Sequence, residues 1–227
     1  MNAFDFAILR WLTSWANRWP WFDGLVAFST NWELVKGGFA LSLYWWAWFR
    51  KGSQQREQRA RLLAALAAAM GALAIASVLA LALPYRPRPR ILVGMDAELS
   101  PGWAEWSAFP SDHATLFFAL ATGLWMVARP LGLIALVHTV AVVCFPRVYL
   151  GLHYPTDILG GTVIGVASVL LVDRSRFVLR NMCRVAAAAG RHPSVFYALG
   201  FLATYLLATL FGDLRRAGNT FVTWWLR

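Results

Sequence analysis

Hydrophobic and polar residues are arranged along this chain in long blocks. The clearest apolar block is 62–83, LLAALAAAMGALAIASVLALAL, which contains 22 residues and no charge. A helix of this length can cross the roughly 30 Å hydrocarbon core of a membrane. Further apolar blocks occupy 34–49, 111–128, 131–149, 156–172 and 193–212. The pattern therefore predicts an all-α integral membrane bundle of about six transmembrane helices.

The first thirty residues have a shorter, amphipathic pattern. Phe4, Ile8, Trp11 and Trp15 fall on one side of a helix, polar residues fall on the other side, and Pro20 interrupts the pattern. This arrangement is typical of an interfacial helix that lies in the membrane surface. A helix packed against the bundle would produce the same spacing, and both alternatives stay open. The segment lacks a basic region followed by a cleavage site, so we expect no cleaved signal peptide.

Composition and charge agree with a membrane protein. The chain is 59% hydrophobic, contains thirteen tryptophans and has a net charge of +10 at pH 7. The positive charge is concentrated in 50–61 and 173–191, and loops rich in Lys and Arg stay on the cytoplasmic side. Loop 84–110 and corner 147–157 are therefore expected outside, together with both termini. Because the basic residues form no face interleaved with aromatic rings, we expect no nucleic-acid partner.

The first polar cluster on the expected outer side is Pro-Ser-Asp-His at 110–113. Ser111 is a good helix N-cap, and an apolar run follows it at once. The free N–H groups at a helix start favour an anion such as phosphate. His113 would lie in the first helical turn, close to such an anion. An ordinary helix cap with an interfacial histidine is the simpler alternative.

The second cluster is the corner that contains Arg147, His153 and Asp157. Asp157 follows His153 by four residues, so its carboxylate can reach one imidazole nitrogen. Such a hydrogen bond fixes the tautomer and leaves the other lone pair available for attack. Arg147 carries the planar fork that suits phosphate oxygens. A snorkelling arginine beside a structural His–Asp pair is the alternative.

The third cluster is the segment YRPRPR at 85–90. Its arginines, Arg86, Arg88 and Arg90, alternate with prolines, which fix φ and keep the segment extended. Alternate residues of an extended chain point the same way, so we expect all three arginines on one surface. A lipid-headgroup anchor is the alternative interpretation.

Together the three clusters provide what phosphoryl transfer requires. Arginines neutralise the phosphate, one histidine attacks phosphorus, and a second histidine protonates the leaving oxygen. His113, His153 and Asp157 could also ligate zinc. The surrounding arginines would repel a dication, so we expect no metal.

Two of these clusters carry the motifs of a known family. Its motif Pro-Ser-Gly-His corresponds to Pro-Ser-Asp-His at 110–113, and its motif Ser-Arg-x5-His-x3-Asp corresponds to 146–157 with intact Arg, His and Asp spacing. On these motifs, over residues 34–172, the sequence resembles the type 2 phosphatidic acid phosphatase superfamily. That superfamily includes membrane lipid phosphatases, soluble bacterial acid phosphatases and vanadium haloperoxidases.

The resemblance implies a set of roles. His153 would be the nucleophile that forms a phosphohistidine, Asp157 would orient it, and His113 would be the general acid. The phosphate would be held by Arg147, Ser111 and the loop arginines Arg88 or Arg86, with Asp112 beside them. The resemblance implies no metal and no cofactor.

The sequence departs from the family in its first and third motifs. The lysine of the first motif, Lys-x6-Arg-Pro, is absent: its place is Leu81 if Arg88 is the family arginine and Leu79 if Arg86 is. Pro146 replaces the serine of the third motif and removes a hydroxyl contact.

Asp112 stands where the family usually has glycine. It could pair with an arginine, favour product release, or complement the positive helix N-terminus, which is worth about 0.3–1 kcal/mol. We expect Asp112→Gly to retain most activity. Pro-Ser-Asp-His looks like the version in the bacterial undecaprenyl-diphosphatase branch, so the resemblance favours a polyprenyl diphosphate substrate.

The resulting hypothesis is a single-domain lipid phosphatase of the bacterial inner membrane that hydrolyses a terminal phosphate at the outer face. Its expected parts are an interfacial helix at 1–30, a catalytic core at 34–172, and a last span with a tail at 193–227. Phosphatidic acid and phosphatidylglycerol phosphate are alternative substrates to undecaprenyl diphosphate, and transfer of phosphate to another lipid is an alternative reaction. A protein that only binds or transports an anionic lipid headgroup is the alternative from a different class.

Overall fold

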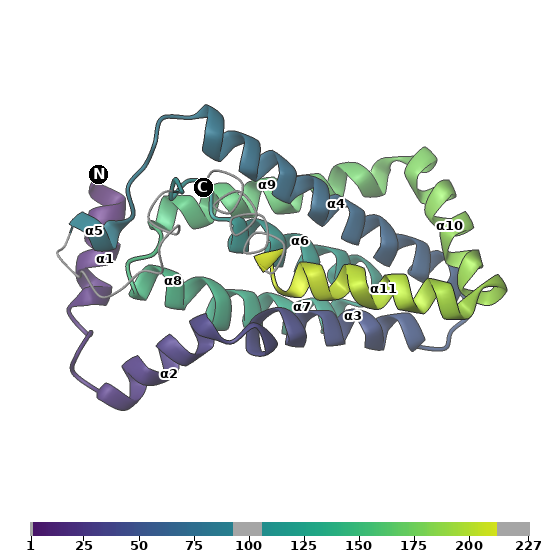
Figure 1. The fold of residues 1–227 in the computed structure, drawn as a ribbon, viewed down its shortest axis with the longest axis horizontal. Helices are drawn as coiled ribbons and strands as arrows, with labels where there is room; N and C mark the ends of the chain where they lie inside the picture. The colour runs from purple at the N-terminus through teal and green to yellow at the C-terminus, as the bar shows by residue number, and fades with distance from the viewer. Residues whose placement is uncertain (1, 93–105, 213–227) are drawn as a thin grey trace, which may run out of the picture.

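The computed structural model describes residues 2–92 and 106–212 (Figure 1). Within these ranges every regular element is a helix, as the sequence predicts, and no strand is present. In chain order, with η for a π-helical turn, they are α1 (Ala3–Thr13), α2 (Pro20–Asn31), η1 (Leu34–Gly38), α3 (Phe39–Phe49), α4 (Gln55–Ala82), α5 (Pro89–Leu92), α6 (Asp112–Val127), α7 (Arg129–His138), η2 (Thr139–Cys144), α8 (Phe145–Tyr149), α9 (Pro155–Arg174), α10 (Arg176–Arg191) and α11 (Pro193–Ala208). Part of the expected loop 84–110 and the expected tail beyond residue 212 lie outside the described residues.

Three helical segments in the described ranges are long and apolar enough to cross a membrane: Gln55–Ala82, Arg129–Tyr149 and Pro155–Arg174. The second runs continuously through α7, η2 and α8. The other expected spans correspond to η1 followed by α3, to α6 and to α11, and each of the three contains 16 residues. A 16-residue helix is about 24 Å long, shorter than the hydrocarbon core. The chain is therefore an all-helical membrane protein, and the expected count of six spans is not confirmed.

The central helix of the bundle is α6. It packs against α4, α7 and α9, and most of its side chains are buried. Glycines on α9 allow the closest of these approaches. A Cβ added at Gly161 would lie 2.5 Å from the carbonyl oxygen of Ser111, and one at Gly165 would lie 2.2 Å from that of Thr115. Small residues thus bring the first turn of α6 directly against α9.

The N-terminal region forms two helices, although the sequence predicted one. Pro20 begins α2 at its first turn, where its missing N–H group costs no hydrogen bond. Helix α1 buries Leu9 and Leu12 in an apolar cluster with residues of α8, whereas Phe4 and Trp11 are exposed. The alternative in which the helix packs against the bundle is therefore confirmed for one face of α1, and the interfacial position stays a prediction that the exposed aromatic residues favour.

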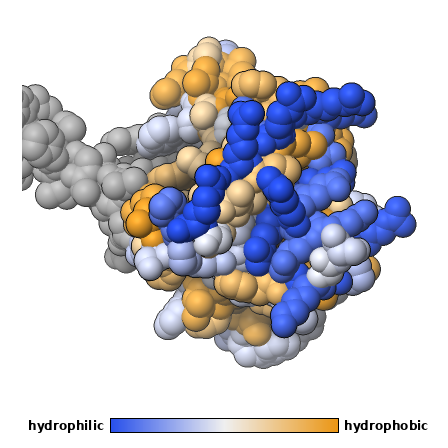
Figure 2. Space-filling model, turned by 90° about the vertical axis from the view of Figure 1, so that its right-hand side faces the viewer, coloured by the Kyte–Doolittle hydropathy of each residue, from blue (hydrophilic) through white to orange (hydrophobic). Residues whose placement is uncertain are grey.

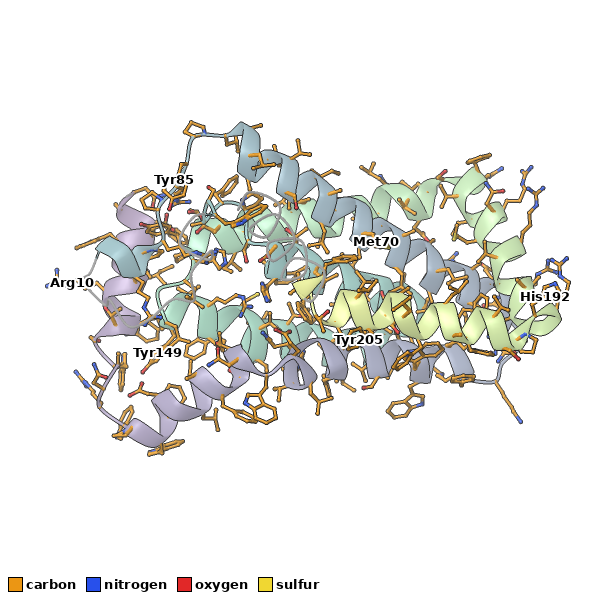
Figure 3. All side chains as sticks on the ribbon, viewed as in Figure 1. Arg10, Met70, Tyr85, Tyr149, His192 and Tyr205 are labelled. Carbon is orange, nitrogen blue, oxygen red and sulfur yellow. The ribbon has the colours of Figure 1, made fainter. Side chains whose placement is uncertain are left out.

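The two ends of the bundle differ in polarity. Helix α10 and the segment before α4, which carry the two basic clusters, lie at the same end (Figure 1). Figure 2 shows long hydrophilic side chains gathered on that end. Figure 3 places His192 there, whereas Tyr85 and Tyr149 lie at the other end, beside α1. The predicted polar clusters therefore lie at the end away from the basic clusters.

Candidate active site

The three predicted polar clusters meet at the end of the bundle that carries α1, α5 and α8 (Figure 1). Backbone hydrogen bonds hold them together. The arginine segment is joined to the residues before the Pro-Ser-Asp-His turn by the N–H of Ala108, which donates to Arg86 O at 2.8 Å, and to the corner by the N–H of Arg90, which donates to Gly151 O at 2.9 Å. The turn is joined to the corner by the N–H of Ser111, which donates to Asp157 O at 3.2 Å. Segments far apart in sequence are thus joined through main-chain atoms. This confirms the expectation that the clusters converge.

The corner between α8 and α9 depends on one glycine. Gly151 has φ of +66°, and a Cβ added there would lie 3.2 Å from the backbone nitrogen of Arg90. Glycine alone adopts this left-handed conformation without steric cost. The carbonyl of Arg147 then accepts hydrogen bonds from the N–H groups of Leu152 at 2.8 Å and His153 at 3.2 Å. The turn directs His153 back into the bundle.

His153 is buried, and a backbone atom sets its orientation. Its Nδ1 lies 2.9 Å from the carbonyl oxygen of Ala108, and its Nε2 lies 3.5 Å from Nη1 of Arg88. A carbonyl oxygen only accepts hydrogen bonds, so Nδ1 carries the hydrogen in the neutral ring. The lone pair is therefore on Nε2, on the side of Arg88. The sequence indicated a carboxylate in the orienting role and gave no signal for the Ala108 carbonyl.

Burial lowers the pKa of His153 below its usual value, the carboxylate of Asp157 opposes that shift, and the charge of Arg88 adds to it. His153 is consequently neutral at pH 7. Burial likewise lowers the pKa of the Arg88 guanidinium, which donates a hydrogen bond to Leu152 O at 2.9 Å.

Asp157 is fully buried and lies beside His153, as predicted, but at a longer distance than a hydrogen bond. Its Oδ2 is 3.7 Å from Nδ1 of His153 and accepts a hydrogen bond from the N–H of Tyr154 at 2.7 Å. The other carboxylate oxygen accepts from Nη1 of Arg86. Asp157 is thereby fixed to the start of α9 and places negative charge next to the imidazole.

Arg86 and Arg88 both reach the His153–Asp157 pair, but they contact different members of it. Arg86 donates hydrogen bonds to the carboxylates of Asp5 and Asp157, and its guanidinium lies 4.1 Å from the ring centroid of Tyr154. The extended segment ends at Pro89, where α5 begins. The structure therefore places the Arg86 guanidinium between two carboxylates, whereas Arg88 reaches the His153 side chain.

Arg147 is 3% exposed, and its Nη1 has no hydrogen-bond partner among the described residues. A buried guanidinium donor without a partner costs free energy, because its bonds to water are lost and not replaced. Arg147 is close enough to Asp112 and His113 to interact with both electrostatically. An unpaired cationic donor at this position is suited to an anion.

His113 and Asp112 form a second histidine–carboxylate pair. Nδ1 of His113 lies 2.7 Å from Oδ1 of Asp112, which also accepts the backbone N–H of His113 at 2.7 Å. Nε2 is thus the nitrogen of His113 that can exchange a proton with a bound group. Ser111 is buried as the N-cap, its Oγ accepting from the N–H of Ala114 at 3.4 Å. The Asp112 carboxylate therefore orients His113, and its expected place beside phosphate stays a prediction.

A buried lysine near the site was missed as a site residue by sequence reasoning. Lys36 in η1 is 2% exposed and donates hydrogen bonds to Thr30 O and to Oε1 of Glu33 at 3.1 Å. It interacts electrostatically with Arg147 and Asp112. Its only sequence signal is that it interrupts the apolar block 34–49 with a charge. Lys36 adds positive charge to the neighbourhood of the site.

An open groove of about 470 Å³ lies between η1 and α3 on one side and α7 and η2 on the other. Its lining is mainly apolar and includes Val35, Phe39 and Val142. His138 also lines it, and its Nε2 lies 2.8 Å from Val35 O, a bond across helices. The groove contains none of the predicted site residues, but Val35 precedes Lys36 in the same helical turn.

Comparisons with curated proteins identify three relatives. The chain is 38% identical over 66 residues to the bacitracin transport permease protein BcrC of Bacillus licheniformis, covering 29% of this chain and 32% of that protein. It is 38% identical over 63 residues to the putative undecaprenyl-diphosphatase YbjG of Escherichia coli, covering 28% and 32%. It is 32% identical over 96 residues to the undecaprenyl-diphosphatase BcrC of Bacillus subtilis, covering 42% and 48%. These matches span about a third to a half of the relatives' length.

Among solved structures, a transmembrane PAP2-type phosphatidylglycerolphosphate phosphatase from Bacillus subtilis is similar with a TM-score of 0.49 and 24% identity, covering 76% of this chain and 87% of that one. The sequence profile of the PAP2 superfamily matches residues 60–180, which is more than half of the chain. The matched range contains the arginine segment, the Pro-Ser-Asp-His turn and the corner with His153. This chain therefore belongs to the PAP2 superfamily.

Proposed function

We propose that this membrane protein is a lipid phosphatase that removes the terminal phosphate of a polyprenyl diphosphate, undecaprenyl diphosphate in the first place, through a phosphohistidine on His153. One observation carries the proposal. The carbonyl of Ala108 holds Nδ1 of His153, so the lone pair of Nε2 lies on the side of the buried Arg88 guanidinium. A nucleophile next to a fixed cation is the arrangement that phosphate transfer needs.

The reaction has two steps. Arg88 and Arg147 hold the terminal phosphate, and Nε2 of His153 attacks phosphorus while the bond to the bridging oxygen breaks. His113, protonated on both nitrogens, gives the proton on Nε2 to that oxygen, and the lipid monophosphate leaves. Water then attacks the phosphohistidine, His113 takes a proton from it, the P–N bond breaks, and inorganic phosphate is released.

The two carboxylates have separate roles in this scheme. Asp157 stabilises the positive charge that the imidazole of His153 gains when Nε2 bonds to phosphorus, since its Oδ2 is 3.7 Å from Nδ1. Asp112 accepts from Nδ1–H of His113, so the proton that His113 gives or takes is the one on Nε2. Arg86 fixes Asp157 and has no direct contact with phosphate in the proposed mechanism.

The substrate class rests on two supports. Two of the relatives are named as undecaprenyl-diphosphatases, one of them putatively. The open apolar groove beside the site has room for part of a lipid chain that enters laterally from the bilayer. The basic clusters at the opposite end favour a cytoplasmic position for that end, so we propose an active site at the outer face of the bacterial inner membrane.

The test is phosphate release by purified protein in detergent with EDTA. Undecaprenyl diphosphate, phosphatidic acid and phosphatidylglycerol phosphate are compared as substrates. In a second assay the terminal phosphate of the substrate carries a radioactive label, and the enzyme is isolated under alkaline conditions in which a labelled phosphohistidine survives. We expect turnover of the diphosphate that His153→Ala abolishes together with the label. His192→Ala, at the opposite end, serves as the matched control and retains wild-type rates. Release from none of the three lipids, or full activity of His153→Ala, would contradict the proposal.

A further inference from the structure

The N-terminal helix α1 contributes a carboxylate to the neighbourhood of the site. Asp5 lies in the first turn of α1 and is fully buried. Its oxygens accept hydrogen bonds from Thr156 at the start of α9, from the backbone N–H at 2.9 Å and from Oγ1 at 2.7 Å. Asp5 also accepts from Nη2 of Arg86 at 2.6 Å. A buried carboxylate is retained at low cost only when all such partners are present.

Arg86 connects this carboxylate to the reacting histidine. One nitrogen of its guanidinium, Nη2, donates to Asp5, and the other, Nη1, donates to Asp157 and, at 2.9 Å, to Oγ1 of Thr156. Asp157 in turn is the carboxylate beside Nδ1 of His153. The planar fork of an arginine fixes two acceptors relative to one another. The Asp157 carboxylate is therefore held at one oxygen by the N–H of Tyr154 and at the other by Arg86, which Asp5 holds in turn.

We infer that Asp5 is a positioning residue for catalysis, which holds Arg86 so that Arg86 keeps the Asp157 carboxylate against the imidazole of His153. This inference rests on the proposed function. Asp5 contacts none of the groups assigned to the phosphate, so its effect passes through Arg86 and Asp157. Docking of α1 on the bundle then completes the active site.

Helix α1 is also held in place by contacts independent of this network. Leu9 and Leu12 are buried in the cluster that contains Val148, Tyr149 and Tyr154. Truncation of Leu9 weakens the docking of α1 but removes no hydrogen bond of Asp5. The chain therefore offers a matched control that separates the anchoring of α1 from the positioning of Asp157.

The experiment compares steady-state and single-turnover rates of Asp5→Asn, Leu9→Ala, Asp157→Asn and the double variant Asp5→Asn/Asp157→Asn. In metal sites, removal of the partners that orient a ligating side chain costs about tenfold to 100-fold in activity, and we take this as the scale for a positioning residue. We expect a loss of that size in kcat for Asp5→Asn, with KM changed by less than about threefold because Asp5 does not touch substrate. Leu9→Ala should retain kcat at matched thermal stability.

The double variant gives the decisive comparison. If Asp5 acts through Asp157, the further loss on adding Asp5→Asn to Asp157→Asn is below about twofold, because the two substitutions remove the same interaction. Two results together would overturn the inference: Asp5→Asn and Leu9→Ala lose kcat equally, and the losses of Asp5→Asn and Asp157→Asn multiply in the double variant. Asp5 would then only hold α1 on the bundle. Wild-type kcat in Asp5→Asn, with His153→Ala inactive, would overturn this inference alone. An inactive wild type would overturn the proposed function as well.

Discussion

Oδ1 of Asp112 lies 2.7 Å from Nδ1 of His113 and accepts the backbone N–H of the same histidine. This double contact orients the imidazole that we propose as the general acid. Glycine at position 112 has no acceptor for Nδ1, so the geometry predicts a loss of activity in Asp112→Gly, whereas the sequence alone predicts that most activity is retained.

Substitution of Asp112 should therefore reduce kcat more than it changes KM. General acid–base catalysis contributes roughly 100-fold to 10,000-fold, and Asp112→Gly should lose at least about tenfold of this. Asp112→Asn keeps an oxygen acceptor without the charge and should lose less. Initial rates on undecaprenyl diphosphate measure both variants, and an Asp112→Gly enzyme within twofold of wild type would contradict the assigned role.

The buried position of His153 sets the acidic limit of activity. Burial lowers the pKa of His153 below its usual value of about 6.5. The neutral ring has the attacking lone pair, so on the acidic side kcat/KM should fall only as the pH drops through this lowered pKa. The pH profile of kcat/KM reports this group in the free enzyme. A midpoint above pH 7 would be incompatible with a neutral buried nucleophile.

The same pKa shift affects stability. As the pH falls below about 6.5, His153 takes up a proton in the unfolded chain but not in the folded chain. The free energy of unfolding therefore decreases as the pH falls through this range. Thermal midpoints in detergent between pH 5 and pH 8 should show a decline on the acidic side that is smaller in His153→Gln. An identical decline in both proteins would assign the loss to other groups.

Arg147 should be required for phosphate binding because its planar guanidinium group can donate two parallel hydrogen bonds. The unpaired Nη1 donor is buried, and a lysine ammonium cannot reproduce two parallel hydrogen bonds. We expect Arg147→Ala and Arg147→Lys each to lower kcat/KM by about 100-fold or more. Calorimetry with inorganic phosphate should show binding to wild type and none to either variant. Arg180→Ala, an exposed arginine at the opposite end, is the control, and similar losses there would indicate a nonspecific charge effect.

Close packing between α6 and α9 should be sensitive to one added methyl group. A Cβ at Gly165 would lie 2.2 Å from Thr115 O, so Gly165→Ala forces the helices apart and should cost about 1–3 kcal/mol of stability. Gly71 in α4 has nothing within 4 Å of the added atom. Gly71→Ala should be neutral or stabilising by up to about 1 kcal/mol. Thermal unfolding of both variants measures the contrast, and equal midpoints would refute the packing argument.

Much of the site could be predicted because its residues lie at fixed spacing beside helix starts. Ser111 and His113 begin α6, and Asp157 begins α9, so their positions follow from capping and apolar patterns. Their convergence followed from charge asymmetry along the chain, which indicated a common membrane face.

The remaining parts depend on contacts that carry no local pattern. Asp5 contacts Arg86, 81 positions later in the chain, and it lies on the buried side of α1, whereas the aromatic residues Phe4 and Trp11 that dominate the pattern are exposed. Its one signal is that no other acidic residue occurs in the first 22 positions. Helix α2 was missed because Pro20 was interpreted as a break, although proline also suits the first turn of a helix.

The acceptor that fixes His153 is a carbonyl of the main chain, at Ala108. Every amino acid has that atom, so no substitution at position 108 can delete it, and a survey of residue identities cannot reveal it. The methyl group of Ala108 is fully buried, so a larger side chain does not fit at this position. A survey of residue identities can show that restriction to small side chains. The path of the backbone at position 108 therefore determines which nitrogen of His153 carries the lone pair. Changing that nitrogen would require moving the main chain, not replacing a side chain.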